Sequence, residues 1–120
     1  MIGELIKFIG DTFPTATFGQ IQDEPDSLLN INIYDNSNSP FFNDTSTHTL
    51  TINLFIRDAS FEVMLENNEV INTWLVDLYD ADILNIHIVN TKKTGSQDPS
   101  RDDKNRYYIY STFEMLVEEV

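Results

Sequence analysis

One alternating segment constrains the fold of this chain more than any other. In "THTLTINLFIR", residues 47–57, apolar side chains recur at every second position. Side chains on a β-strand point to opposite faces with a period of two, so this pattern predicts a strand with one buried face. The residues expected on that face are Leu50, Ile52, Leu54 and Ile56.

A long helix is predicted directly after this strand. Asp58 stands where an N-cap belongs, since its carboxylate can accept hydrogen bonds from the free amides of the first turn. The apolar residues that follow recur at i, i+3 and i+4, a spacing typical of a helix with one buried side. These residues are Phe61, Met64, Leu65, Ile71, Trp74, Leu75 and Leu78.

The remaining elements complete a small α+β domain. A short amphipathic helix is expected over residues 2–13, ended by Pro14, because the residue before a proline is disfavoured in the helical region. Further strands are expected at 15–22, 28–35, 82–91 and 106–119. We therefore predict one domain over residues 1–120: an antiparallel or mixed sheet of four to five strands with two helices on one face. The hairpin loop at about 92–105 is polar and long enough to be mobile.

The net charge of −13 excludes several classes of partner. Tight binding to nucleic acid depends on lysine and arginine releasing counterions from phosphate, so no specific nucleic-acid binding is expected. No apolar run approaches the roughly 20 residues that a membrane-spanning helix needs, so no membrane partner is expected either. The chain has no cysteine, which rules out disulfides and thiolate chemistry.

The charge is also unevenly distributed. Residues 92–106 contain five of the seven basic residues and only three acids, so this segment is net +2 while the rest of the chain carries −15. One interpretation is that loops tolerate charge and solubility requires it. The other is complementarity, because a basic loop on an acidic body can dock on a second copy of that body. Head-to-tail contacts of this kind close into rings when the rotation permits.

The sequence does not contain the residues of a common catalytic or metal site. The stretch "DPSRDDKNRYYI" resembles a calcium loop at its first positions, but Asp103 stands where the sharp turn needs glycine and Ile109 where glutamate is needed. His48 and His87 are isolated on predicted strands, there is no Gly-x-Ser-x-Gly motif, and the glycines do not cluster. We expect no catalytic residues, no metal and no cofactor, and we predict that the protein is not an enzyme.

Aromatic residues provide candidate contacts with other proteins. Phe41 and Phe42 are adjacent in the polar segment "NSNSPFFNDTS", where a loop cannot easily bury both, so one of them can anchor a neighbouring protein. The tyrosines of "RYYIY" could in principle stack on bases. The glutamates that follow them favour packing or a protein interface instead.

Two segments resemble a known family. "THTLTINLFIRDASFEVMLENNEVINTWL" has a strand closing on Arg57, a short connection and a long helix ending in an aromatic-leucine pair. "DPSRDDKNRYYIYSTFEMLV" has an acidic turn, an arginine and a final aromatic strand, with Asn105 where glycine is common. Together with "LLNINIYDNSNSP", these features resemble the minor capsid and tail-completion (tail terminator) proteins of long-tailed bacteriophages.

This resemblance implies a structural role in a virion assembled in the bacterial cytoplasm. Tail terminators form a ring, usually of six subunits, that caps the tail tube and meets the head connector. The expected partners are therefore copies of this chain, a tail tube protein and a head connector protein. The residues expected at these protein interfaces are Phe41, Phe42, Arg57, Arg101, Asp102, Asp103, Lys104 and Arg106.

Two other functions remain open from the sequence. A small acidic inhibitor that mimics DNA and blocks a nucleic-acid enzyme would have a similar size and charge. Its carboxylates would form rows at phosphate-like spacing, whereas Asp26, Asp44 and Asp58 stand singly in predicted turns and at a helix start. An unrelated oligomeric adaptor is the third alternative.

Overall fold

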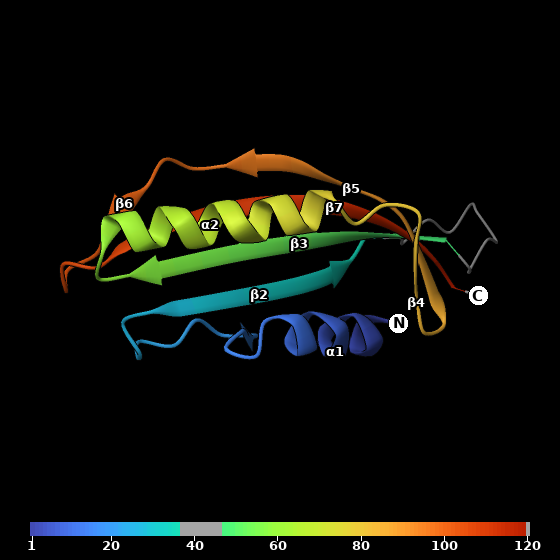
Figure 1. The fold of residues 1–120 in the computed structure, drawn as a ribbon, viewed down its shortest axis with the longest axis horizontal. Coiled ribbons are helices and arrows are strands. Elements are labelled where there is room, and N and C mark those ends of the chain that lie inside the picture. The colour runs from blue at the N-terminus through green and yellow to red at the C-terminus, as the bar shows by residue number, and fades with distance from the viewer. Residues whose placement is uncertain (37–46, 120) are drawn as a thin grey trace.

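A single curled sheet forms one layer of the protein and two helices form the other (Figure 1). The structure is a computed structural model, and it describes residues 1–36 and 47–119. The elements in chain order are α1 (Ile2–Thr12), β1 (Thr17–Phe18), β2 (Leu28–Asp35), β3 (Thr47–Asp58), α2 (Phe61–Val76), β4 (Ala81–Ile83), β5 (Ile86–Ser96), β6 (Ser100–Arg101) and β7 (Tyr107–Glu119).

The sheet is mixed and has the order β1-β2-β3-β7-β5-β4, with β6 paired to β7. Strands β1 and β2 run parallel, and the other neighbours pair antiparallel. The predicted α+β class is correct, but the described residues form a sheet of seven strands instead of four to five. The count was too low because the two-residue strand β6 is too short to leave an alternating pattern, and because the segment 82–91 belongs to two strands, β4 and β5.

The segment 82–91 is a hairpin and was wrongly predicted as one strand. The chain reverses after Ile83, and Leu84 adopts a left-handed conformation with φ of 50°. Alternation alone did not indicate this turn, because it contains neither glycine nor proline. Strand β5 then continues to Ser96, so residues 92–96 of the predicted loop are paired with β7. The mobility of this region stays a prediction.

The strand predicted at 15–22 is also much shorter than expected. Only Thr17 and Phe18 pair with β2, and Gly19 follows with a φ of 92° that a side chain would disfavour. The carbonyl of Gly19 accepts hydrogen bonds from the side chains of Asn30 and Asn32, at 3.0 and 2.9 Å. The chain therefore leaves the sheet at Gly19 and forms the connection to β2.

The core lies between the helices and the predicted apolar face of β3. Leu50, Ile52, Leu54 and Ile56 are all at most 1% exposed, as the alternation predicted. They pack with further buried residues of both helices and of β7: Leu5, Ile9, Met64, Ile71, Leu75, Ile109, Phe113 and Met115. One continuous core therefore places both helices on the same face of the sheet, as expected.

Aromatic packing joins the two helices. The Trp74 ring of α2 stacks on Phe8 with centroids 5.5 Å apart and meets Phe13 edge-on at 5.0 Å. Both phenylalanines come from the α1 region, which ends before Pro14 as predicted. This contact fixes α1 beside α2 over the sheet.

The N-cap of α2 is Ser60, and the prediction of Asp58 was wrong. The Ser60 hydroxyl accepts from the Val63 amide at 3.3 Å, which satisfies one free donor of the first turn. Asp58 is the last residue of β3, and its carboxylate accepts instead from the Ser60 amide at 2.8 Å. The helix therefore begins later, and Phe61 and Leu65 of the predicted buried stripe are exposed.

Candidate protein interface

Six of the eight residues predicted at an interface lie in or next to one turn. Residues 101–106 connect β6 to β7, and Arg57 lies opposite Tyr108 at the adjoining end of β3. Phe41 and Phe42 lie outside the described residues, so their contacts stay predictions. The structure thus gathers the charged candidates at one end of the sheet.

Asp102 fixes the conformation of this turn. Its Oδ1 accepts from the backbone amides of Lys104 and Arg106, both at 2.9 Å, and its Oδ2 accepts from Arg106 Nε at 2.8 Å. Desolvation raises the pKa of Asp102, but the hydrogen bonds from Arg106 and Lys104 outweigh it, and the pKa lies below its usual value. Asn105 takes the left-handed position with φ of 61°, the geometry for which asparagine can replace glycine. Asp103 is exposed on the same turn.

Arg106 ties the turn to a distant acidic loop, residues 19–27. The residue is only 4% exposed, and its Nη2 donates to Asp23 Oδ1 at 3.1 Å while Nη1 faces Asp26 Oδ1 at 3.4 Å. Nη1 also donates to the Asp23 carbonyl, and Lys104 forms an ion pair with the Asp23 carboxylate. The guanidinium therefore has its donors directed toward groups of its own chain.

Arg57 holds the same acidic loop from the sheet side. Its Nη2 donates to the carbonyls of Pro25 and Asp23 at 2.6 and 3.2 Å, and its Nε donates to the Asp26 carbonyl at 3.3 Å. The residue is 4% exposed. Arg57 and Arg106 thus act as intrachain clamps here, and a contact of either with another subunit stays a prediction.

Three other basic residues are exposed, and we call them the basic edge: Lys92, Lys93 and Arg101. Lys92 approaches Glu114 at 3.4 Å but is 70% exposed at its side chain. Arg101 donates to the Asn105 side chain at 2.8 Å and lies over the ring of Tyr107. Within residues 1–36 and 47–119, neither Lys93 nor Arg101 pairs with a carboxylate. Lys92 and Lys93 both belong to the basic segment 92–106, but neither was predicted at an interface.

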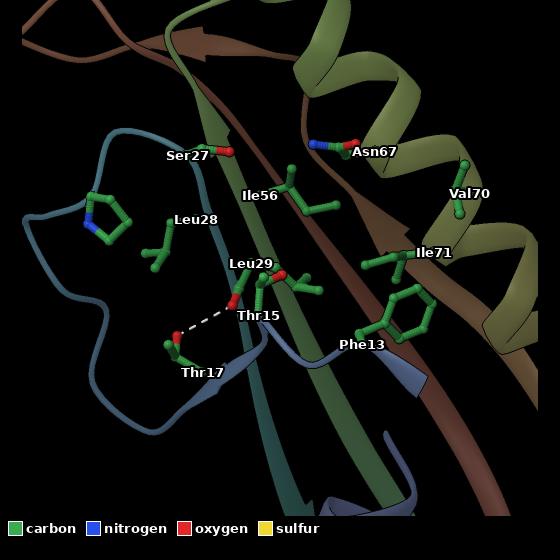
Figure 2. A pocket seen from close by; sticks show the side chains of 11 residues that line it. Phe13, Thr15, Thr17, Ser27, Leu28, Leu29, Ile56, Asn67, Val70 and Ile71 are labelled. Carbon is green, nitrogen blue, oxygen red and sulfur yellow. Dashed lines mark hydrogen bonds between the residues drawn. The ribbon is translucent and has the colours of Figure 1, made fainter. Parts of the chain in front are cut away.

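The helical layer contains a groove that the sequence did not reveal. A cavity of about 390 Å³ opens between α2 and the segment 13–29, with Leu29 and Ile56 of the sheet beneath it (Figure 2). Val70 of α2 lines the groove and is 59% exposed. The sequence contains one indication of this groove, the apolar Val70 on a part of α2 outside the predicted buried stripe. A single apolar residue outside the stripe does not predict a groove.

The outer face of the sheet carries a cluster of aromatic rings. Phe55 is only 6% exposed there because Tyr108 and Tyr110 flank it, with centroids 5.7 and 4.9 Å away. No helix of the described chain covers this face. Of the two expectations for these tyrosines, packing or a protein interface, the structure shows packing for the pair around Phe55, and the interface stays a prediction.

His87 lies on β5 between two carboxylates. Its Nδ1 is 2.7 Å from Asp82 Oδ1 and its Nε2 is 3.2 Å from Asp80 Oδ1, with Glu118 opposite on β7. The hydrogen bond with Asp82 raises the pKa of His87 above 6.5 in spite of partial desolvation. Within the described residues, no group of three or more His, Asp or Glu side chains is placed to hold a metal ion.

We predict a pH-dependent contribution from this contact. Because the folded pKa of His87 lies above its unfolded value, the stabilisation is complete below about pH 6.5 and is lost as the pH rises through the folded pKa. Asp82→Asn should therefore destabilise the protein at about pH 5.5 and have a smaller effect at about pH 9. Urea unfolding at both pH values tests this, with the exposed Asp98→Asn as control; an equal loss at both would contradict it.

Comparison with known proteins identifies a fold that occurs in a virion. No family model matches the sequence, and no curated protein does. Among solved structures, one similar chain belongs to "Virion of native gene transfer agent (GTA) particle", with a TM-score of 0.61 and 15% sequence identity. The match covers 92% of this chain and 84% of that chain, so it includes both layers of the fold. Among the described residues, no helix has the length and apolar character needed to cross a membrane.

Proposed function

We propose that this chain is a structural, non-enzymatic virion protein that acts as a tail terminator. The observation that carries the proposal is the fold shared with a chain of a gene transfer agent virion over 92% of the present chain. The sequence features that resemble tail-completion proteins support it independently. Arg57 lies one residue before the end of β3, a two-residue connection follows Asp58, and α2 begins at Phe61.

The charge of the protein suits a ring around a DNA passage. A ring through which DNA moves should not bind phosphate tightly, and the net charge of −13 opposes such binding. An acidic wall repels phosphate over about a Debye length, roughly 8 Å at physiological salt. The protein would therefore bind neighbouring protein subunits without binding the DNA that passes through the ring.

The proposed partners follow from this role. Copies of the chain would form a ring of six at the end of the tail tube, with the tube protein on one side and the head connector on the other. The basic edge is the outward-facing cationic surface of an otherwise acidic molecule, so it suits a contact with an acidic neighbour. The protein would then be part of the finished virion.

A deletion of the gene from the phage or prophage that carries it tests this function. We expect a lysate with filled heads separated from tails, many of them abnormally long, when viewed by negative-stain electron microscopy. Expression of the intact gene from a plasmid is the control and should restore joined particles. Normal joined virions in the deletion lysate would contradict the proposal and favour a DNA-mimic inhibitor.

A further inference from the structure

The groove beside α2 has an apolar interior and an acidic rim. Its lining includes apolar side chains from both layers: Phe13, Leu28, Leu29, Ile56, Val70 and Ile71. A second, more open hollow is lined by Glu66, Glu69, Val70 and Thr73. Val70 belongs to both, so the apolar groove continues into an acidic surface along α2.

The carboxylates of this rim have no cation of their own chain. Across the described residues, neither Glu66 nor Glu69 forms an ion pair, and Glu62 lies one turn earlier on the same helix without one. Both glutamates at the rim are exposed. The rim is therefore a negatively charged surface next to a mostly apolar cavity of about 390 Å³, whose lining also includes Thr15, Thr17, Ser27 and Asn67.

The basic edge has the opposite properties. Strand β4 pairs with β5 only over Ile86–Ile88, so within the described chain no strand pairs with the outer side of residues 92–96. Lys93 is exposed on this side, and Arg101 is exposed on β6, which pairs with an earlier part of β7. Within the described residues, neither has a carboxylate partner. Lysine and arginine can lay their methylene stems on apolar surface while their charges stay at the rim. These side chains thus match the groove in both its apolar and its acidic parts.

We propose that the basic edge of one copy docks on the acidic rim and apolar groove of a second copy. The two surfaces are different, so the contact is heterologous, and repetition of it closes into a ring when the rotation permits. This inference rests on the proposed function for its setting, since a ring-forming protein needs two complementary surfaces. It adds the receiving surface, Glu66 and Glu69 beside the groove, and it identifies Lys93 and Arg101 as the residues that meet it.

Charge exchange in the purified full-length chain tests the contact. The first variant is Lys93→Glu with Arg101→Glu, and the second is Glu66→Lys with Glu69→Lys. Self-association is measured by sedimentation velocity over a range of concentrations at low salt, and circular dichroism verifies the fold. Lys7→Glu and Glu24→Lys, which reverse exposed charges elsewhere, are the matched controls.

We expect each double variant alone to weaken self-association by tenfold or more, because like charges would then face each other. An equimolar mixture of the two variants should restore association, since every contact in an alternating assembly again joins opposite charges. Retained association in either folded variant would overturn the inference, as would a mixture that does not recover or a wild-type chain that stays monomeric throughout. In those cases the role of Lys92 and Lys93 would be limited to preventing the edge strand β5 from pairing with a strand of another molecule. The deletion phenotype is independent of this result, so the failure of one proposal is distinguishable from failure of the other.

Discussion

Replacement of Arg106 by methionine is expected to lower the Tm by about 10 °C or more, because it removes one partner from a buried charge cluster. Arg106 is 4% exposed, and its guanidinium meets the carboxylates of Asp102, Asp23 and Asp26. Methionine preserves much of the side-chain volume but provides no donor. The three carboxylates would then repel one another, with Lys104 and Arg57 as the cations that still offset them among the described residues.

The Arg106→Met change should loosen the acidic loop, residues 19–27, before the whole domain unfolds. Arg106 joins the turn that precedes β7 to an acidic loop that lies 83 residues away in the sequence. Without this bond, backbone amides of residues 19–27 should exchange with solvent faster than those of the core strands β3 and β7. Hydrogen exchange followed by mass spectrometry measures this difference directly.

The matched control is Arg101→Met, which removes an arginine of the same segment. Arg101 is exposed, and within residues 1–36 and 47–119 its side chain hydrogen-bonds to Asn105 and lies over the ring of Tyr107, so its loss should change the Tm by no more than about 2 °C. Asp102→Asn combined with Arg106→Met should cost less than the sum of the two single changes, because both act on one contact. Equal Tm values for Arg106→Met and Arg101→Met would contradict the role of Arg106 as an intrachain clamp.

Phe113→Ala is the second large effect that we expect. Phe113 is fully buried on β7, opposite Ile52, and it is the largest of the fully buried side chains of the core. Truncation of a buried phenylalanine removes apolar contacts and leaves a cavity, which costs about 3–5 kcal/mol of unfolding free energy. Since domains of this kind are stable by only about 5–15 kcal/mol, the variant should be close to unfolding at room temperature.

Urea unfolding measures this effect, with Tyr110→Ala as the control. Tyr110 lies on the same strand but on the uncovered face, and it is 37% exposed. Its truncation should cost about 1 kcal/mol, mainly from lost contact with Phe55. Phe113→Leu should be intermediate, since it fills most of the space. If Tyr110→Ala were the more damaging change, the core would have been placed on the wrong face of the sheet.

Much of the fold could be predicted because apolar residues recur at a regular spacing along long strands and helices. The buried face of β3, which includes Leu50 and Ile56, followed from a period of two, and a final strand was expected over residues 106–119, where β7 lies. The hairpin at Leu84 could not be predicted, because the residue in the left-handed conformation is a leucine, which does not indicate a turn. The residues on either side of it also belong to one continuous apolar pattern. Local sequence also placed the N-cap at Asp58, where two oxygen-bearing residues competed and the tertiary structure selected Ser60.

The candidate interface was predictable only as a region. The sequence showed that cations gather between residues 92 and 106, but it could not show which of them are used within the chain. Arg106 and Lys104 turn to Asp23, a partner that no spacing rule reveals at such separation. The groove was not predictable for a similar reason, because its lining comes from α2, from the sheet and from the segment after α1, which are far apart in the sequence (Figure 2).

Immunogold labelling of purified virions tests the proposed location most directly. An epitope tag on the chain, introduced into the phage that carries the gene, would be detected by negative-stain electron microscopy. We predict gold at one position on each particle, the joint between head and tail, and no label on a particle with an untagged chain. Purified virions that carry no label, or carry it along the tail or over the head shell, would contradict a role as tail terminator.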